Sequence, residues 1–274
     1  MKKKTKKIGL ALGGGGARGC AHIGVIKALQ KANIPIDYIA GCSIGAVVGG
    51  IFATGGLNDF ETYLTKLTKK DILTKFDPVW MKNGFFGGEK ATKILEQFLG
   101  KKTFRGCKIP FSAVATDLIH GKEVVLSKGS LKEAIRASIS LPGVFTTVKK
   151  SGTELVDGGV INPLPVNVVR KMGAEIVIAV DLNYHYIQHK KHSRIKQKGN
   201  QKKHRSTFGV VESALFLMLD QITEKNLQTH PADVLLRMDL GDISVFDFSQ
   251  VEIMLEEGYT QMKKQIKTVK KMIL

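Results

Sequence analysis

The chain of 274 residues contains only three cysteines and no long hydrophobic run. Cys20, Cys42 and Cys107 are too few and too far apart for a disulfide framework or a zinc site. No stretch approaches the roughly 20 apolar residues that span a bilayer. The apolar run at residues 8–12 follows a lysine-rich start but is too short for a signal peptide. We therefore expect a cytoplasmic globular protein with no metal and no other cofactor.

Acidic residues are absent from three strongly basic segments. Residues 1–7 hold five lysines, residues 188–206 hold eight lysines or arginines, and residues 263–271 hold five lysines. The rest of the chain has 24 basic and 24 acidic residues. Basic segments attract anionic lipid headgroups and nucleic acids alike, but these three lack the aromatic side chains on which bases stack. We expect peripheral contact with anionic membranes at the inner membrane surface and no nucleic acid; a merely solvated surface is the alternative.

Short apolar runs alternate with helical patterns along the chain, which predicts an α/β fold. Strands are predicted over 7–12, 36–41, 111–116, 123–126, 154–156, 175–182 and 233–236, and helices over 17–31, 44–53, 59–70, 89–99, 131–138, 165–172, 207–228 and 251–271. The almost continuous apolar run at 175–182 is typical of a parallel strand that is covered on both faces. We expect three α/β/α layers around a mainly parallel sheet.

One domain is predicted, in three parts. Residues 7–182 form the catalytic core, residues 183–206 form a basic surface loop without periodicity, and residues 207–274 complete the domain with helices and a strand. Six consecutive apolar residues at 214–219 predict a buried helix there.

Two glycine-framed segments lie where a predicted strand runs into a predicted helix. The second, GCSIG at residues 41–45, fits a nucleophile elbow, a strained turn that exposes the Ser43 hydroxyl. The first, GGGGARG at residues 13–19, can direct backbone N–H groups toward one point, as an oxyanion hole requires. Together they indicate a serine hydrolase of acyl esters; a helix N-cap role for Ser43 is the alternative.

A serine nucleophile needs a base. The elbow follows only the second predicted strand, which is too early for an α/β-hydrolase with its Ser-Asp-His order. Three later histidines lie in the basic segment, and His230 is the best remaining candidate. Asp157 fits better, because it follows an apolar pair and precedes Gly158 and Gly159, where burial would raise its pKa. An ordinary Asp-Gly turn is the alternative reading of Asp157.

Four sequence blocks occur in a characteristic order. They are Gly14-Gly15-Gly16-Ala17-Arg18-Gly19, Gly41-Cys42-Ser43-Ile44-Gly45-Ala46, ASISLPGVF at 137–145, and Asp157-Gly158-Gly159. With these blocks, residues 7–182 resemble the patatin-like phospholipase family. Cys42 stands where threonine is frequent in that family, and Gly159 where alanine is common. Without long terminal extensions, the chain is most similar to compact bacterial members.

The resemblance implies a calcium-independent hydrolase of fatty-acyl esters of (phospho)lipids, with a patatin-like, lysophospholipase-like fold and a Ser–Asp dyad that needs no histidine. Ser43 would be the nucleophile and Asp157 the base. The oxyanion hole would be formed by the loop Gly14, Gly15, Gly16, Ala17, Arg18 and Gly19. Ser43 would attack the ester carbonyl, and water would release the fatty acid from an acyl-enzyme.

Three other functions fit parts of the sequence. A lipid acyltransferase could use the same site with another acceptor. A non-enzymatic basic module could bind membranes or nucleic acid. A dinucleotide-binding fold would use Gly14-x-Gly16-x-x-Gly19 with Asp37, but Asp37 precedes its strand, whereas a ribose-binding acid follows one.

Overall fold

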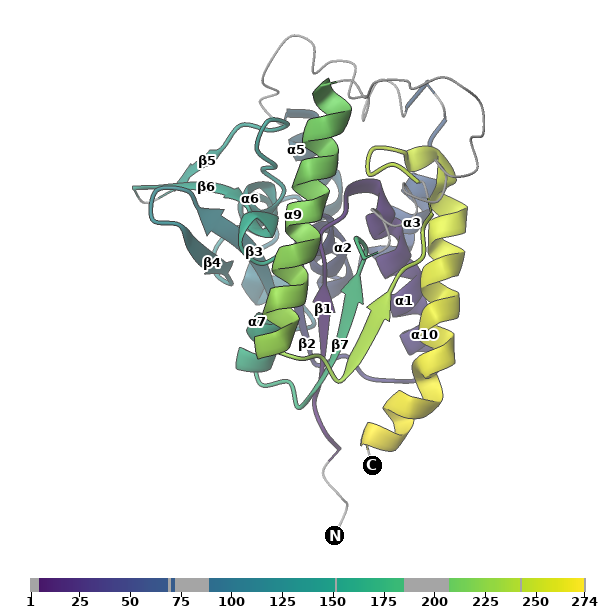
Figure 1. The fold of residues 1–274 in the computed structure, drawn as a ribbon. Coiled ribbons are helices and arrows are strands. Elements are labelled where there is room, and N and C mark those ends of the chain that lie inside the picture. Colours follow the sequence, from purple (N-terminus) through teal and green to yellow (C-terminus); the bar gives the residue numbers. More distant parts are fainter. Residues whose placement is uncertain are drawn as a thin grey trace, which may run out of the picture.

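The computed structural model describes residues 5–68, 70–71, 89–150, 152–184, 207–241 and 243–273 (Figure 1). The strands are β1 (Ile8–Leu12), β2 (Tyr38–Cys42), β3 (Phe111–Asp117), β4 (Lys122–Leu126), β5 (Val148–Lys150), β6 (Thr153–Asp157), β7 (Ile176–Asp181) and β8 (Val234–Arg237). The helices are α1 (Cys20–Lys31), α2 (Ile44–Ala53), α3 (Leu57–Thr65), α5 (Glu89–Leu99), α6 (Leu131–Ser138), α7 (Val166–Lys171), α9 (Thr207–Thr229) and α10 (Val251–Ile273). Short 3₁₀ turns lie at Gly16–Gly19, Phe104–Gly106, Gly158–Val160 and Phe248–Gln250.

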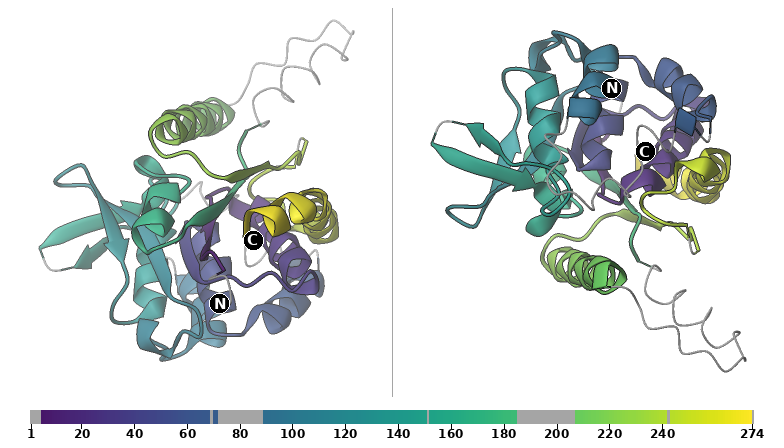
Figure 2. Two further views of the ribbon diagram at one scale, coloured as in Figure 1. Left: turned by 90° about the horizontal axis from the view of Figure 1, so that it is seen from below. Right: turned by 90° about the horizontal axis from the view of Figure 1, so that it is seen from above.

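The strands form one sheet in the order β5-β6-β3-β2-β1-β7-β8, with β4 also paired to β3. The five strands from β3 to β8 in this order are parallel, whereas β4, β5 and β6 are added antiparallel. Helices α7 and α9 cover one face, and α1, α2 and α10 cover the other (Figures 1 and 2). The predicted three-layer α/β/α fold with a mainly parallel sheet is confirmed.

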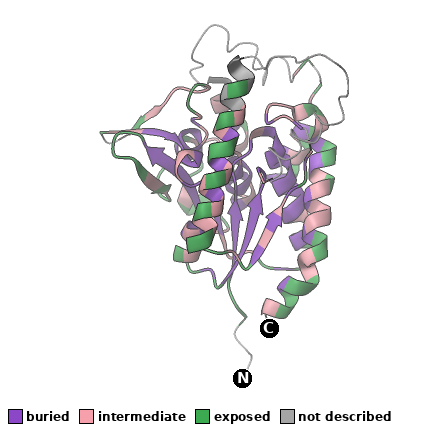
Figure 3. Ribbon diagram, in the orientation of Figure 1, coloured by how far each residue is buried: buried purple, intermediate pink, exposed green. Residues whose placement is uncertain are grey.

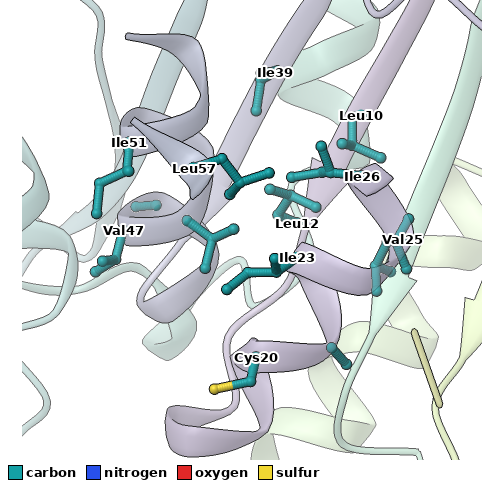
Figure 4. Close-up of a cluster of buried hydrophobic side chains, with 14 of the residues drawn as sticks. Leu10, Leu12, Cys20, Ile23, Val25, Ile26, Ile39, Val47, Ile51 and Leu57 are labelled. Carbon is teal, nitrogen blue, oxygen red and sulfur yellow. The ribbon is translucent and has the colours of Figure 1, made fainter. Parts of the chain in front are cut away.

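The central strands separate two hydrophobic layers because their side chains alternate between faces. Ile8, Leu10 and Leu12 of β1 pack toward α1, α2 and α10, while Ala11 packs toward α7. Figure 4 shows part of the larger cluster, where side chains from β1, α1 and α2 meet. β1 and β7 are buried along their whole length (Figure 3), which explains their continuous apolar sequences.

Strand β3 brings two distant segments to one point. Ala113 and Val114 pair with both β2 and β4, and the last three residues of β3 pair with both β4 and β6. Two partners of one residue must lie on opposite edges of its strand, so β2 and β6 share one edge of β3. The final residue of β2, Cys42, lies opposite Val114, and the final residue of β6, Asp157, lies opposite Ala115. The two strands therefore end head to head.

The boundaries of the predicted elements agree with the structure to within a few residues, with two differences. The short strand β5, which completes a hairpin with β6, was not predicted. The prediction that residues 214–219 are buried is wrong: Phe216 and Leu219 are buried, but Ala214, Leu217 and Met218 are exposed. Most of the predicted basic loop lies outside the described residues, as do residues 1–4 of the basic start.

Helices α1 and α10 touch backbone to backbone. A Cβ added at Gly24 of α1 would lie 2.0 Å from the carbonyl oxygen of Leu255, and one added at Gly258 of α10 would lie 2.0 Å from that of Ala21. No side chain fits at either position. This contact attaches the C-terminal helix to the first helix of the chain.

We expect Gly24→Ala to lower the free energy of unfolding by about 1–3 kcal/mol, because overpacking the crossing outweighs the better helix propensity of alanine. Guanidinium titration followed by circular dichroism measures this. Gly106→Ala is the matched control, since an added Cβ there meets no heavy atom within 4 Å. Equal unfolding midpoints for the two variants would contradict the tight crossing.

Candidate active site

Ser43 occupies a strained turn between β2 and α2. Its φ of 53° and ψ of −123° place a non-glycine residue in a region that costs about 1–3 kcal/mol. The turn is possible because glycines flank it: a Cβ at Gly41 would lie 2.4 Å from the carbonyl oxygen of Gly45, and one at Gly45 would lie 2.1 Å from that of Leu12. This is the geometry of a nucleophile elbow.

The Ser43 side chain makes no capping hydrogen bond to α2, although Ser43 is the N-cap residue of that helix. The alternative role as an ordinary N-cap therefore has no support in the geometry. The start of α2 still adds a partial positive charge beside the hydroxyl, which favours a developing anion.

Asp157 ends β6 and is buried. Burial raises the pKa of its carboxyl to about 6, while the neighbouring Ser43 hydroxyl, the Gly159 N–H and the Cys42 thiol favour the ionised form and oppose the rise. Its Oδ1 accepts from the Gly159 N–H at 2.8 Å and lies 3.7 Å from Cys42 Sγ. A carboxyl with this pKa is largely ionised at pH 7 but holds a proton far more readily than a surface aspartate.

The second oxygen of this carboxyl, Oδ2, has no partner of full hydrogen-bond geometry within the described residues. The Ser43 hydroxyl lies beside this carboxyl, because the preceding residue, Cys42, places its Sγ 3.7 Å from Asp157 Oδ1, and the hydroxyl lowers the pKa of Asp157. The hydroxyl thus neighbours the carboxylate without completing a hydrogen bond, an arrangement that often tightens when substrate binds. The structure brings these two predicted residues together.

Ser138, at the end of α6, connects both halves of the site. Its hydroxyl accepts from the Ser43 N–H at 2.9 Å and donates to the Val114 carbonyl at 2.6 Å. Two residues later, the carbonyl of Ser140 accepts from the Asp157 N–H at 2.9 Å. The ASIS part of the third sequence block thus holds the backbone of both Ser43 and Asp157. Sequence reasoning used this block only for the resemblance and missed its role.

The glycine loop passes directly beside Ser43, since a Cβ on Gly14 would lie 3.4 Å from Ser43 Cβ. Two of its expected oxyanion donors are already occupied: the Gly14 N–H donates to Pro163 at 3.0 Å, and the Ala17 N–H donates to Val245 at 2.7 Å.

The N–H groups of Gly15 and Gly16 differ from these two, because no backbone carbonyl of the described residues accepts from them. Among residues 14–17 of the loop, the candidate donors therefore narrow to Gly15 and Gly16. Gly16 also requires its glycine, with φ +57° and a Cβ position only 2.2 Å from the Val245 carbonyl oxygen.

Arg18 does not face the site. Its buried guanidinium donates to the carbonyls of Ile243 at 2.7 and 2.9 Å, of Leu182 at 3.2 Å and of Gly241 at 3.3 Å. Its side chain therefore fixes the glycine loop to the C-terminal part of the chain. Gly19, at the end of the same turn, packs against Ile44 of the elbow.

Two further buried side chains support the loop. His22 Nε2 lies 2.8 Å from the Gly13 carbonyl oxygen, and burial lowers the pKa of its ring to about 4, so the ring is neutral and donates. The Asn183 side chain donates to the Gly14 carbonyl at 3.0 Å. The sequence offered no signal for the His22 contact, and for Asn183 only its position directly after the predicted strand 175–182.

The other described histidines lie away from this site. His120 hydrogen-bonds to Asp117 at 2.7 Å in an exposed turn, and His230 is exposed after α9. Within the described ranges, no three His, Cys, Asp or Glu residues are grouped as metal ligands, and no helix is long and apolar enough to cross a membrane.

Several known proteins are similar to this chain. A family model described as "Patatin-like phospholipase" matches residues 10–170, more than half of the chain. An uncharacterized NTE family protein of Mycobacterium bovis is 44% identical over 179 residues, which are 65% of this chain and 50% of that protein. Human patatin-like phospholipase domain-containing protein 6 is 35% identical over 181 residues, 64% of this chain and 13% of that protein.

The chain thus spans about half the length of the mycobacterial relative, and the matched part is a small share of the human one. Among solved structures, VipD from Legionella pneumophila superimposes with a TM-score of 0.52 at 13% identity, covering 97% of this chain and 67% of that chain. This likeness shows a shared fold.

We expect Ser138→Ala to reduce kcat for p-nitrophenyl butyrate by about 10–100-fold, because Ser43 is the predicted nucleophile and misplacing a nucleophile is costly even when binding persists. Ser130→Ala is the matched control at the other end of α6. Ser130 caps that helix by accepting from the Glu133 N–H, so its loss should cost about 1 kcal/mol of stability and leave kcat unchanged. Equal kcat in both variants would contradict the connecting role of Ser138.

Proposed function

Because the chain belongs to the patatin-like phospholipase family, we propose that it hydrolyses acyl ester bonds of lipids with Ser43 as nucleophile and Asp157 as base. The observation that carries this proposal is the buried Asp157 carboxyl, whose free oxygen neighbours a hydroxyl on a strained elbow. A strained turn and an ionisable group without a full set of partners both cost stability, and such costs cluster at functional sites.

The first step is proton transfer from Ser43 to Asp157 as the serine oxygen attacks the ester carbonyl. A base works best when its pKa lies near the working pH, and the Asp157 pKa of about 6 is closer to neutrality than that of a surface aspartate. The Gly159 N–H holds Oδ1, which leaves Oδ2 to receive the proton.

The negative charge on the former carbonyl oxygen is stabilised by the N–H groups of Gly15 and Gly16 and by the start of α2. One such donor contributes about 3–4 kcal/mol to lowering the barrier in comparable enzymes. Because Arg18, His22 and Asn183 hold the glycine loop through hydrogen bonds, its N–H donors need no reorganisation to stabilise this charge.

The alcohol then leaves with the proton from Asp157, and an acyl-enzyme remains on Ser43. Water attacks this ester with Asp157 again as base, which releases the fatty acid and restores the serine. In this scheme backbone amides and the start of α2 stabilise the negative charge and Asp157 carries the proton, so calcium has no assigned role.

We further propose that the whole protein works at anionic membranes, with residues 1–7, 188–206 and 263–271 as the basic contacts. Each lysine or arginine near an anionic surface contributes about 1 kcal/mol of attraction. A cytoplasmic location, peripheral at the inner membrane surface, would follow from such contacts.

We expect Ser43→Ala to lower turnover of p-nitrophenyl butyrate by at least about a thousand-fold, because no other group can form the acyl-enzyme. Asp157→Asn should be similarly inactive. A fluorophosphonate probe should add its mass to the peptide that contains Ser43 and to no peptide of the Ser43→Ala variant. Turnover that persists in Ser43→Ala would refute the assignment.

The pH dependence should report Asp157. The base must be unprotonated, so kcat/KM should fall about ten-fold per pH unit below its pKa of about 6 and level off above pH 7. An ordinary aspartate would place this limb near pH 4.

Asp181 is the control for this assignment, because burial also raises the pKa of that carboxyl to about 6. Asp181→Asn keeps an oxygen that can accept from the Asn183 N–H, as Asp181 Oδ1 does at 2.9 Å. The acid limb should persist in this variant, measured over pH 5–8. If kcat/KM of Asp181→Asn no longer falls at low pH, the titration belongs to Asp181.

A further inference from the structure

Helix α9 has an outward face with an unusual composition. Val210, Leu217 and Met218 are exposed by 51%, 46% and 58%, and Ala214 is exposed between them. Their spacing of four, three and one residues places all four on one stripe of the helix. The next outward positions, Gln221 and Lys225, are polar. The outward face is therefore apolar in the first half of α9 and polar afterwards.

This arrangement is the reverse of a normal surface helix, whose outward face is polar. The inward side of α9 is satisfied separately: Phe216 and Leu219 are buried and cluster with Val245. The exposed side chains therefore have no role in holding α9 to the body. Large apolar side chains gathered on a surface mark a place of contact with another apolar phase or partner.

The apolar half of α9 lies at the end of the sheet that carries the candidate active site. α9 runs opposite to the parallel strands, so its first turns lie at their carboxyl ends, where Ser43 is located (Figure 1). Leu219 packs beside the base motif: a Cβ added at Gly159 would lie 3.2 Å from Leu219 Cδ2. One turn of helix thus carries Leu219 toward the site and Met218 toward solvent.

The charge of the sequence that precedes α9 indicates which kind of apolar partner this face contacts. The sequence immediately before α9, residues 188–206, contains eight basic and no acidic residues. Apolar side chains that follow a basic run are suited to an anionic lipid surface, where the basic residues attract headgroups and the apolar ones enter the acyl boundary. A protein partner of ordinary mixed charge would gain nothing from such a run.

We propose that the outward apolar face of α9, formed by Val210, Ala214, Leu217 and Met218, inserts into the surface of an anionic bilayer and holds the carboxyl ends of the sheet against it. The proposal rests on the proposed function, since a lipid ester is drawn from that bilayer. It assigns to α9 the apolar part of docking, which the basic segments alone do not provide.

The test compares Leu217→Ser/Met218→Ser with Ile253→Ser in the full chain. Ile253 is exposed by 59%, as much as Met218, but lies on α10 on the opposite face of the sheet (Figure 2). Binding is measured by sedimentation with vesicles of equal parts phosphatidylglycerol and phosphatidylcholine. A Ser43→Ala background leaves the lipid intact, so binding is read independently of catalysis.

The double variant should bind at least about ten-fold more weakly, whereas Ile253→Ser should bind like the parent. Gln221→Leu, which extends the apolar stripe by one turn, should bind more tightly. Vesicles of phosphatidylcholine alone should bind the parent weakly.

Hydrolysis of soluble p-nitrophenyl butyrate, measured with Ser43 present, should be the same in all α9 variants. If the wild type does not hydrolyse p-nitrophenyl butyrate, the proposed function is refuted, but the binding result still stands. Equal vesicle binding by the double variant and the parent would overturn the role of α9. A shift from dimer to monomer in the double variant, without a change in vesicle binding, would also overturn it and assign the face to a second copy.

Discussion

The site depends on one edge of one strand. The first part of β3 pairs with β2, a parallel strand that ends at Cys42. The last part of β3 pairs with β6, an antiparallel strand that ends at Asp157. Because neighbouring residues of β3 hold the two strand ends, a serine and an aspartate more than a hundred residues apart in sequence have no freedom to separate. Backbone hydrogen bonds of the sheet thus determine how far Ser43, the proposed nucleophile, lies from Asp157, the proposed base.

A second set of contacts holds Ser43 and Asp157 in these positions. Ser138 and Ser140 hold the backbone N–H groups of Ser43 and Asp157, and the glycine turns exclude side chains where the elbow crosses β1. The cost is visible in the buried carboxyl, whose ionised form is disfavoured by desolvation. The same desolvation makes Asp157 a better proton acceptor, as its proposed role requires.

The sequence predicted the architecture well because its signals were strong and local. Alternating apolar runs gave β1, β7 and α2, and the glycines at the elbow marked a turn that only small residues permit. The antiparallel pairing of β6 with β3 had no such signal, since register between distant strands is a tertiary property. For the same reason the loop's free donors, the support from His22 and Asn183, and the outward apolar face of α9 became apparent only in three dimensions.

Arg18 makes the chain's two ends mutually dependent. Its guanidinium is buried, and two of its acceptors, at Gly241 and Ile243, come from beyond residue 240. A fragment that stopped at residue 170, the end of the matched family region, would keep every residue of the proposed chemistry. It would also leave the buried positive charge of Arg18 without these hydrogen-bond acceptors, which is costly in an apolar interior. The part of the chain that can hold the candidate site is therefore larger than the region that matches the family model, because residues beyond 240 fix the glycine loop in place.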